Sequence, residues 1–177
     1  LADNYAITKV EGTLTVTALT DKVTVTITEK SGTEKYDGTE KTVEGYTVEI
    51  DNKLYKEGDF TFSGDATVKG TNAGTYNMEL KPENFSNDNK NFANVEFVIV
   101  DGTLEITKRE VTLTSATDSK VYDGTALKKD EVTVSGDGFV EGEGASYTVT
   151  GTQTEVGKSD NRFTYTLNDG TLADNYA

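Results

Sequence analysis

An internal duplication constrains the fold of this chain more than any other feature. The six residues Leu-Ala-Asp-Asn-Tyr-Ala occur at 1–6 and again, unchanged, at 172–177. Such a match is typical of a segment taken from a repeat array, out of phase with the repeat boundaries. We therefore expect like units in tandem, with the terminal piece of one unit at the N terminus.

Two further motifs set the length of the repeat. Gly-Thr-Leu-x-x-Thr occurs at 12–17 and at 102–107, and a repeat of about 90 residues is long enough to form a small domain. The sequence predicts three parts: 1–17 as terminal strands of a preceding unit, 18–107 as a complete module, and 108–177 as a second module without its final strands. We call 18–107 the first repeat and 108–177 the second repeat. The tetrapeptide Tyr-Asp-Gly-Thr occurs once in each, as Tyr36, Asp37, Gly38 and Thr39 and as Tyr122, Asp123, Gly124 and Thr125.

Alternating apolar and Thr residues predict strands with one buried face. Val23, Val25 and Ile27 alternate with threonines, and Leu14 and Val16 do the same within 13–17. The chain shows no sustained helical period, and Gly and Asn supply turn signals between the short runs. We expect a mainly β fold of two tandem small modules, β-grasp-like or immunoglobulin-like, arranged as an elongated rod.

The composition excludes several classes of function. The formal charge is −14, which argues against nucleic acid and anionic membrane surfaces as partners. The chain has no His and no Cys, so catalysis or metal binding through imidazole or thiolate is excluded. No apolar run is long enough to span a membrane. We expect no enzyme activity, no cofactor and no metal.

The division into parts has a structural consequence. A module without its last strands exposes a sheet edge, and a lone strand at 1–17 has no sheet to join. Each could satisfy the other between two molecules by strand donation, giving head-to-tail self-association. The alternative is that residues 1–17 pack on the adjacent face of the first repeat.

The stretch 4–17 resembles the closing motif of the MBG and YDG repeat domains, and the two Tyr-Asp-Gly-Thr sequences resemble the motif that names the YDG type. The resemblance covers essentially the whole chain. It implies compact β-rich modules strung together in secreted, multi-repeat surface proteins of bacteria, many of them described as adhesins. It implies no catalytic residues.

Several groups of residues are candidates for binding sites. The Tyr-Asp-Gly-Thr motif could form a ligand loop. It could instead form a turn, in which Gly38 takes positive φ, Asp37 bonds nearby backbone and the Tyr36 ring packs beneath. Dispersed carboxylates form no evident catalytic pair, and an isopeptide crosslink of Lys with Asn or Asp stays open. Exposed Tyr rings could stack on sugars. The candidate calcium ligands are Asn87, Asp88, Asn89 and Asn91, and the candidate sugar platforms are Tyr55 and Tyr147.

The sequence favours a non-catalytic stalk or spacer repeat of a bacterial cell-surface protein, extracellular and projecting other domains from the wall. Its partners would be adjacent copies of the same repeat. The alternative is an adhesive module that binds host glycan or extracellular matrix through its loops at 51–59 or 81–94.

Overall fold

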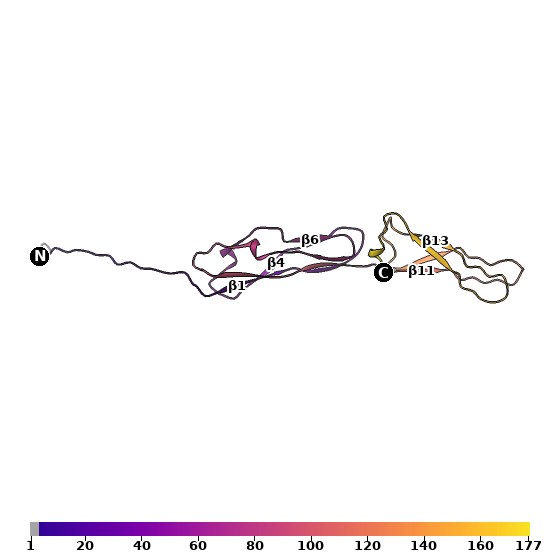
Figure 1. The fold of residues 1–177 in the computed structure, drawn as a ribbon, viewed down its shortest axis with the longest axis horizontal. Helices are drawn as coiled ribbons and strands as arrows, with labels where there is room; N and C mark the ends of the chain where they lie inside the picture. Colours follow the sequence, from indigo (N-terminus) through magenta and orange to yellow (C-terminus); the bar gives the residue numbers. More distant parts are fainter. Residues whose placement is uncertain (1–3) are drawn as a thin grey trace. The chain divides into compact units, whose positions relative to one another are not determined.

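The computed structural model describes residues 4–177 (Figure 1). The chain divides into two compact units. Unit 1 comprises residues 1–27, 48–64 and 81–99, and unit 2 comprises 28–47, 65–80 and 100–177. The structure is built from short strands with single turns of 3-10 helix, so the expected mainly β fold is confirmed. These units are made of separate stretches of the chain and do not test the predicted module boundaries at 17 and 107. Those boundaries therefore stay a prediction.

Unit 1 contains most of a three-stranded sheet of order β4-β1-β9. Val23, Val25 and Ile27 in β1 are fully buried, so their predicted inward face is confirmed. The sheet's strands are β1 (Val23–Glu29), β4 (Tyr46–Ile50) and β9 (Val95–Val100). Separately, β5 (Phe60–Phe62) pairs with β8 (Phe85–Asn87). A 3-10 turn precedes each of these two strands, η2 (Glu57–Asp59) before β5 and η3 (Pro82–Asn84) before β8.

Aromatic side chains fill the core of unit 1. Tyr55 is 1% exposed and lies edge-on to the ring of Phe92, with 5.0 Å between the ring centroids. Phe60 packs against both Phe85 and Phe97. Large rings allow a chain with few aliphatic side chains to bury enough apolar area for a stable core.

Unit 2 is organised around β10 (Thr103–Thr107). This strand pairs in parallel with β2 (Gly32–Lys35) and antiparallel with β7 (Gly74–Asn77), and β3 (Lys41–Glu44) pairs with β6 (Thr67–Gly70). Leu104 and Ile106 of β10 are 0% and 2% exposed. Glu29 is 3% exposed, and its carboxylate accepts the amides of Leu80 and Gly102, each at 2.6 Å. The start of β10 is therefore fixed by charge-assisted hydrogen bonds.

The second repeat, which lies entirely in unit 2, is less complete. None of the apolar side chains described for residues 108–177 is buried. Its strands form two separate pairs, β11 (Val111–Ser115) with β12 (Val132–Gly136) and β13 (Ala145–Val149) with β14 (Phe163–Leu167), followed by the 3-10 turn η4 (Ala173–Asn175). The β11–β12 pair resembles the β1–β4 pair of the first repeat.

Residues 4–17 correct one expectation. The predicted strand at 13–17 does not form: Leu14 is 100% exposed and Val16 is 97% exposed, and Figure 1 draws the segment as an extended trace. A strand needs a neighbour to pair its backbone groups, and this segment has none here. The alternative that it packs on the first repeat is also wrong for the described residues, since Ile7 and Val10 are exposed too. Residues 1–3 lie outside the described part.

Candidate functional site

Polar contacts join the first repeat to the second inside unit 2. The phenol of Tyr36 donates to Glu143 Oε1 at 2.5 Å, and the phenol of Tyr176 donates to Glu143 Oε2 at 2.7 Å. The two rings meet edge to face, with centroids 5.8 Å apart. Burial, followed by the hydrogen bond to Glu143, raises the pKa of Tyr36 to about 12, and the same two causes raise the pKa of Tyr176. One carboxylate therefore clamps a Tyr from each repeat.

A second set of contacts lies beside this clamp. Lys35 Nζ is 2.7 Å from Asp137 Oδ2, and this hydrogen bond, with the amide of Glu110, lowers the pKa of Asp137. The Arg109 guanidinium donates to the carbonyls of Tyr36, Asp137 and Gly138. Arg109 follows β10 by two residues, so the connection between the repeats is itself fixed to both.

Asn175 completes the contact and is fully buried. Its Oδ1 accepts the amide of Ala73 at 2.8 Å, and its Nδ2 donates to Asn72 Oδ1 at 3.1 Å. The backbone of Asn175 also accepts the amide of Arg109. We call the contacts of Tyr36, Lys35, Asn72 and Ala73 with the second repeat the joint. Buried polar groups that are all satisfied favour one arrangement over others.

The two Tyr-Asp-Gly-Thr sequences form matching turns. Asp37 Oδ1 accepts both the amide and the hydroxyl of Thr39, and Asp123 does the same with Thr125. The turn glycines, Gly38 and Gly124, have φ of 80° and 76°, a region that favours glycine.

Each motif Asp is further paired with a lysine. The Lys41 ammonium, then Thr39, holds the pKa of Asp37 well below its usual range, and Lys120 and Thr125 do the same for Asp123. The Tyr rings differ, because Tyr36 is 4% exposed whereas Tyr122 is 58% exposed. The turn interpretation expected a packed ring for Tyr36, and the Tyr122 ring of the second motif is not packed in the same way.

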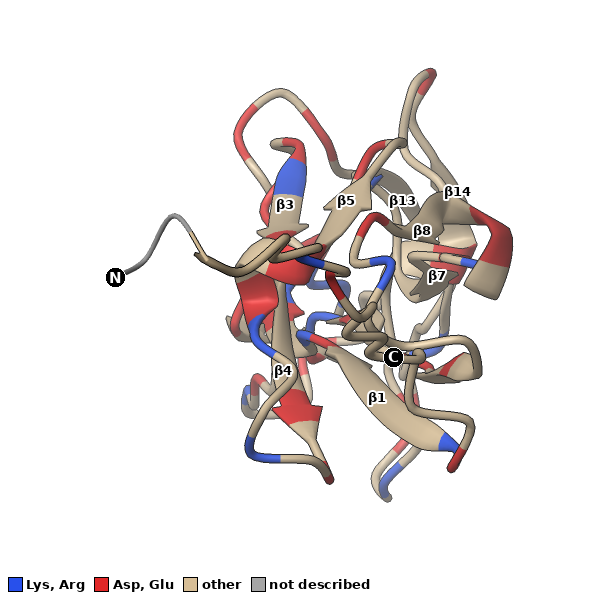
Figure 2. Ribbon diagram, turned by 90° about the vertical axis from the view of Figure 1, so that its left-hand side faces the viewer, with Lys and Arg blue, Asp and Glu red and all other residues tan. Residues whose placement is uncertain are grey.

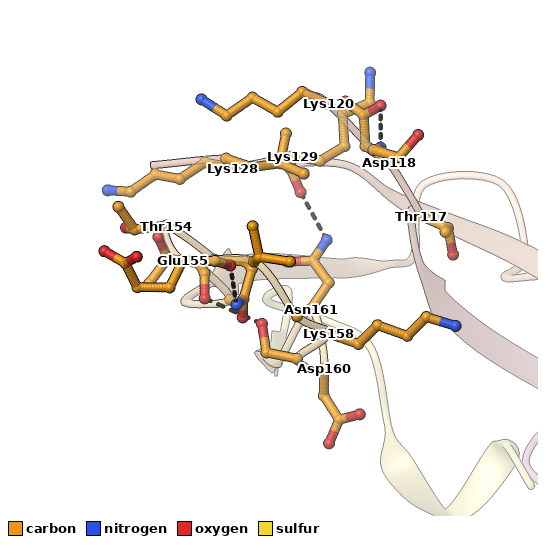
Figure 3. Close-up of a pocket in the computed structure, with 18 of the residues that line it drawn as sticks. Thr117, Asp118, Lys120, Lys128, Lys129, Thr154, Glu155, Lys158, Asp160 and Asn161 are labelled. Atoms are coloured by element: carbon orange, nitrogen blue, oxygen red, sulfur yellow. Dashed lines mark hydrogen bonds between the residues drawn. The ribbon is translucent and has the colours of Figure 1, made fainter. Parts of the chain in front are cut away.

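The second repeat holds an open cavity of about 560 Å³. Figure 3 shows its two walls, one from the segments 117–120 and 128–129 and the other from the loop 154–161. Asn161 bridges the walls, since its Nδ2 donates to the carbonyls of Ala116 and Lys129, each at 2.9 Å. Lysines, acids and a few apolar side chains line the cavity, with no convergent set of groups that would suggest chemistry.

The candidate calcium ligands lie in unit 1, and the side chains of two of them, Asn87 and Asn89, already have other partners. Asn87 Oδ1 accepts the Tyr55 phenol and the amide of Asn89, and Asn89 donates to Asp59 Oδ1. The amide of Asn91 donates to Asn89 Oδ1. The side chains of Asn87 and Asn89 hold the loop to the core, and the described residues contain no group of three or more acids placed to share a metal ion.

The sugar-platform interpretation of Tyr55 is wrong, because the ring is buried in the aromatic core. Burial, with Asp59 and Asp88 nearby, raises the pKa of Tyr55 to about 12. Tyr147 is half-buried against Phe163, so neither ring offers a free face.

Charged side chains show no catalytic grouping. Acidic residues are spread over many strands and loops in Figure 2. Each ion pair found among residues 4–177 has at least one side chain that is 43% or more exposed, so none of these pairs is a fully buried one.

The sequence did not predict the joint. Its contacts are made by Glu143, Asn175 and Arg109, and none of these residues was a candidate site residue. Two signals were available: Arg109 lies at the repeat boundary, and Asn175 belongs to the duplicated Leu-Ala-Asp-Asn-Tyr-Ala segment.

The fold is mainly β and built from short strands, and the joint links residues of the first repeat to residues of the second. Residues 22–108 belong to the MBG domain family, whose family model they match, so the resemblance drawn from the motifs is confirmed there. An MBG domain is a repeat module of surface proteins. Searches among curated proteins and solved structures found no match to the chain. No helix in the described residues is both long and apolar enough to cross a membrane.

Proposed function

We propose that this chain is a non-catalytic spacer segment of an extracellular, bacterial cell-surface protein, which holds other domains away from the cell wall. The observation that carries the proposal is the joint. A spacer transmits position only if successive repeats keep a fixed relation, and a carboxylate shared by Tyr36 and Tyr176, together with buried Asn175, supports a fixed relation. An adhesive module would not need these contacts.

The surface charge supports the same role. A formal charge of −14 over 177 residues keeps neighbouring copies soluble and mutually repelling. The two end loops named for the adhesive alternative are tied into the core of unit 1, through Tyr55 in one and Asn87 in the other. Loops held in this way support the fold, which reduces the free surface they can offer to a glycan.

The test combines rigidity with binding. Residual dipolar couplings of the full chain should fit one alignment tensor for β2–β10–β7 and β11–β12, and two tensors after Glu143→Ala. Glu141→Ala is the matched control, because Glu141 is an exposed acid of the same loop. Two independent tensors in the unaltered chain would contradict the spacer proposal.

A binding screen against mucins, glycans and matrix proteins tests the alternative. We expect no saturable binding at any salt concentration. Saturable binding to one class, lost when loop 51–59 or 81–94 is replaced, would instead establish an adhesive module.

A further inference from the structure

We propose that the first repeat resists tension along the chain, because its first strands pair in parallel with its last strands. The pairs are β1 with β9 and β2 with β10, and we call them the shear ladders. This property goes beyond the spacer role, because a spacer needs repeats in a fixed relation, whereas a chain under tension must also keep each repeat folded. It rests on the proposed function only for the source of the force, at a cell surface.

In unit 1 the entry of the first repeat runs alongside a segment close to its exit. Leu19 forms a parallel bridge with Phe92, and the amide of Val23 donates to the Asn94 carbonyl at 2.9 Å. The two segments continue as β1 and β9, which are hydrogen-bonded neighbours in the sheet β4-β1-β9. The strands β1 and β9 therefore run in the same direction.

In unit 2 the pairing of β2 with β10 is parallel along both strands. Leu104 lies opposite Gly32, and Thr107 lies opposite Lys35. Tyr36 extends the ladder, since its amide donates to the Thr107 carbonyl at 2.9 Å. The strand from which the chain leaves the first repeat is thus bonded along its length to a strand near the entry.

Parallel pairing determines how a pull acts on these strands. A pull from residue 18 draws β1 and β2 toward their beginnings, and a pull from residue 108 draws β9 and β10 toward their ends. Because paired strands run in the same direction, the two pulls slide them past each other, and the hydrogen bonds of a ladder carry the force together. In an antiparallel pair pulled at adjacent ends, the bonds would instead open one at a time.

The other strand pairs of the first repeat lie between the shear ladders in the chain. The pairs β3–β6 and β5–β8 belong to residues 41–87, which a pull reaches only after a shear ladder has separated. The shear ladders therefore set the force at which the repeat opens. On opening, residues 19–107 would release roughly 300 Å of extended chain, at about 3.3–3.6 Å per residue.

Both shear ladders have one face that is shielded from water. Val23, Val25 and Ile27 of β1 and Leu104 of β10 are 0% exposed. A stretched hydrogen bond is lost more readily where water can replace its partner, and it is stronger in surroundings of low dielectric constant. Burial therefore favours a ladder that persists under force.

Polar side chains strengthen the β2–β10 ladder at both of its ends. The start of β10 is already held by Glu29, and Ser31 Oγ accepts the amide of Thr103 at 3.1 Å. At the other end, the hydroxyl of Thr107 donates to the Glu34 carbonyl at 3.2 Å. Separation of a ladder begins at its ends, so hydrogen bonds placed there oppose the first step.

Force spectroscopy of the full chain tests the proposal through the direction of pulling. The chain has no cysteine, so handles attach only where cysteines are introduced. Ala18→Cys with Lys108→Cys loads the shear ladders along their length, because both residues are exposed and flank the paired strands. Thr33→Cys with Glu105→Cys is the matched control: these exposed residues lie opposite each other in β2 and β10, so a pull on them peels the strands apart.

We expect the rupture force at one pulling speed to be at least about twofold higher with handles at 18 and 108, because the bonds share the force in shear and open singly in peeling.

A second pair of variants, made in the chain with handles at 18 and 108, separates the shear ladders from general stability. Ser31→Ala with Thr107→Val removes two hydrogen bonds at the ends of a shear ladder and should lower the rupture force. Tyr55→Phe removes the phenol that contacts Asp59 and Asn87, in the segment that the ladders shield. It should leave the rupture force unchanged, although we expect urea unfolding to show a loss of stability for both variants.

The proposal is overturned if handles at 18 and 108 give a rupture force no higher than handles at 33 and 105. A rupture force that Tyr55→Phe lowers as much as the Ser31→Ala and Thr107→Val variant would overturn it equally. The spacer proposal is tested separately by the residual dipolar couplings. Two alignment tensors in the unaltered chain would reject the spacer role and leave the shear ladders standing.

Discussion

Leu14 and Leu104 occupy the same position of one motif in opposite environments, and this pair gives a quantitative prediction. Leu104 is fully buried in the central strand of unit 2, whereas Leu14 is fully exposed. Leu→Ala at a buried site removes apolar contacts and leaves a cavity, which costs about 2–5 kcal/mol. The same substitution at an exposed site changes stability by about 0.5 kcal/mol or less.

The upper part of the range applies to Leu104. Its strand has neighbours on both sides, β2 and β7, and the start of the strand is fixed by Glu29, so the site cannot easily collapse around a smaller side chain. We expect Leu104→Ala to lower the free energy of unfolding by about 3–4 kcal/mol. With a urea m-value of about 1–3 kcal/mol/M, the unfolding midpoint falls by roughly 1–4 M.

The assay is urea unfolding at the lowest workable protein concentration, followed by amide NMR signals of β10 and β2 so that each part is observed separately. Leu14→Ala is the matched control and should leave the midpoint unchanged. Equal shifts for the two variants, or a loss below about 1 kcal/mol for Leu104→Ala, would refute the assignment of β10 as the organising strand.

Three further outcomes follow from the contacts. Glu29→Gln should lower the free energy of unfolding by about 2 kcal/mol in urea titrations, because its buried carboxylate accepts two backbone amides and hydrogen bonds to charged groups contribute about 1.5–3 kcal/mol. The pKa of Tyr36 is raised from 10.0 to about 12, so the folded chain keeps a proton that the unfolded chain loses; stability should fall between pH 10 and 12, and Tyr36→Phe should reduce that fall in thermal melts. The pKa values of Asp37 and Asp123 lie below their ordinary 3.8, so stability should fall as pH drops below that value, and Asn at both positions should flatten the acid side of the melting profile.

The sequence allowed the strands of the first repeat to be predicted well. Val23, Val25 and Ile27 alternate with threonines, and the period-2 pattern is a local property that needs no knowledge of the neighbours. The turn at Asp37 and Gly38 was equally accessible, because an Asp side chain bonding backbone two residues on and a glycine at positive φ are local effects.

The joint could not be predicted in this way. Glu143 contacts Tyr36 across more than a hundred residues. The local sequence around each of them gives no sign that the two side chains meet. The interpretation of Tyr55 as a sugar platform was wrong for the same reason. Its loop composition favours exposure, but the ring is drawn inward by Phe60 and Phe92, which lie far along the chain or across a turn.

The predicted strand at 13–17 is the most instructive failure. Its pattern is nearly that of 103–107, so local preference cannot explain why one forms a strand and the other does not. The difference is the presence of neighbours: β10 lies between β2 and β7, whereas residues 13–17 have nothing beside them. Strand formation in this family of segments is therefore a property of the completed sheet, because backbone groups pair only across neighbours.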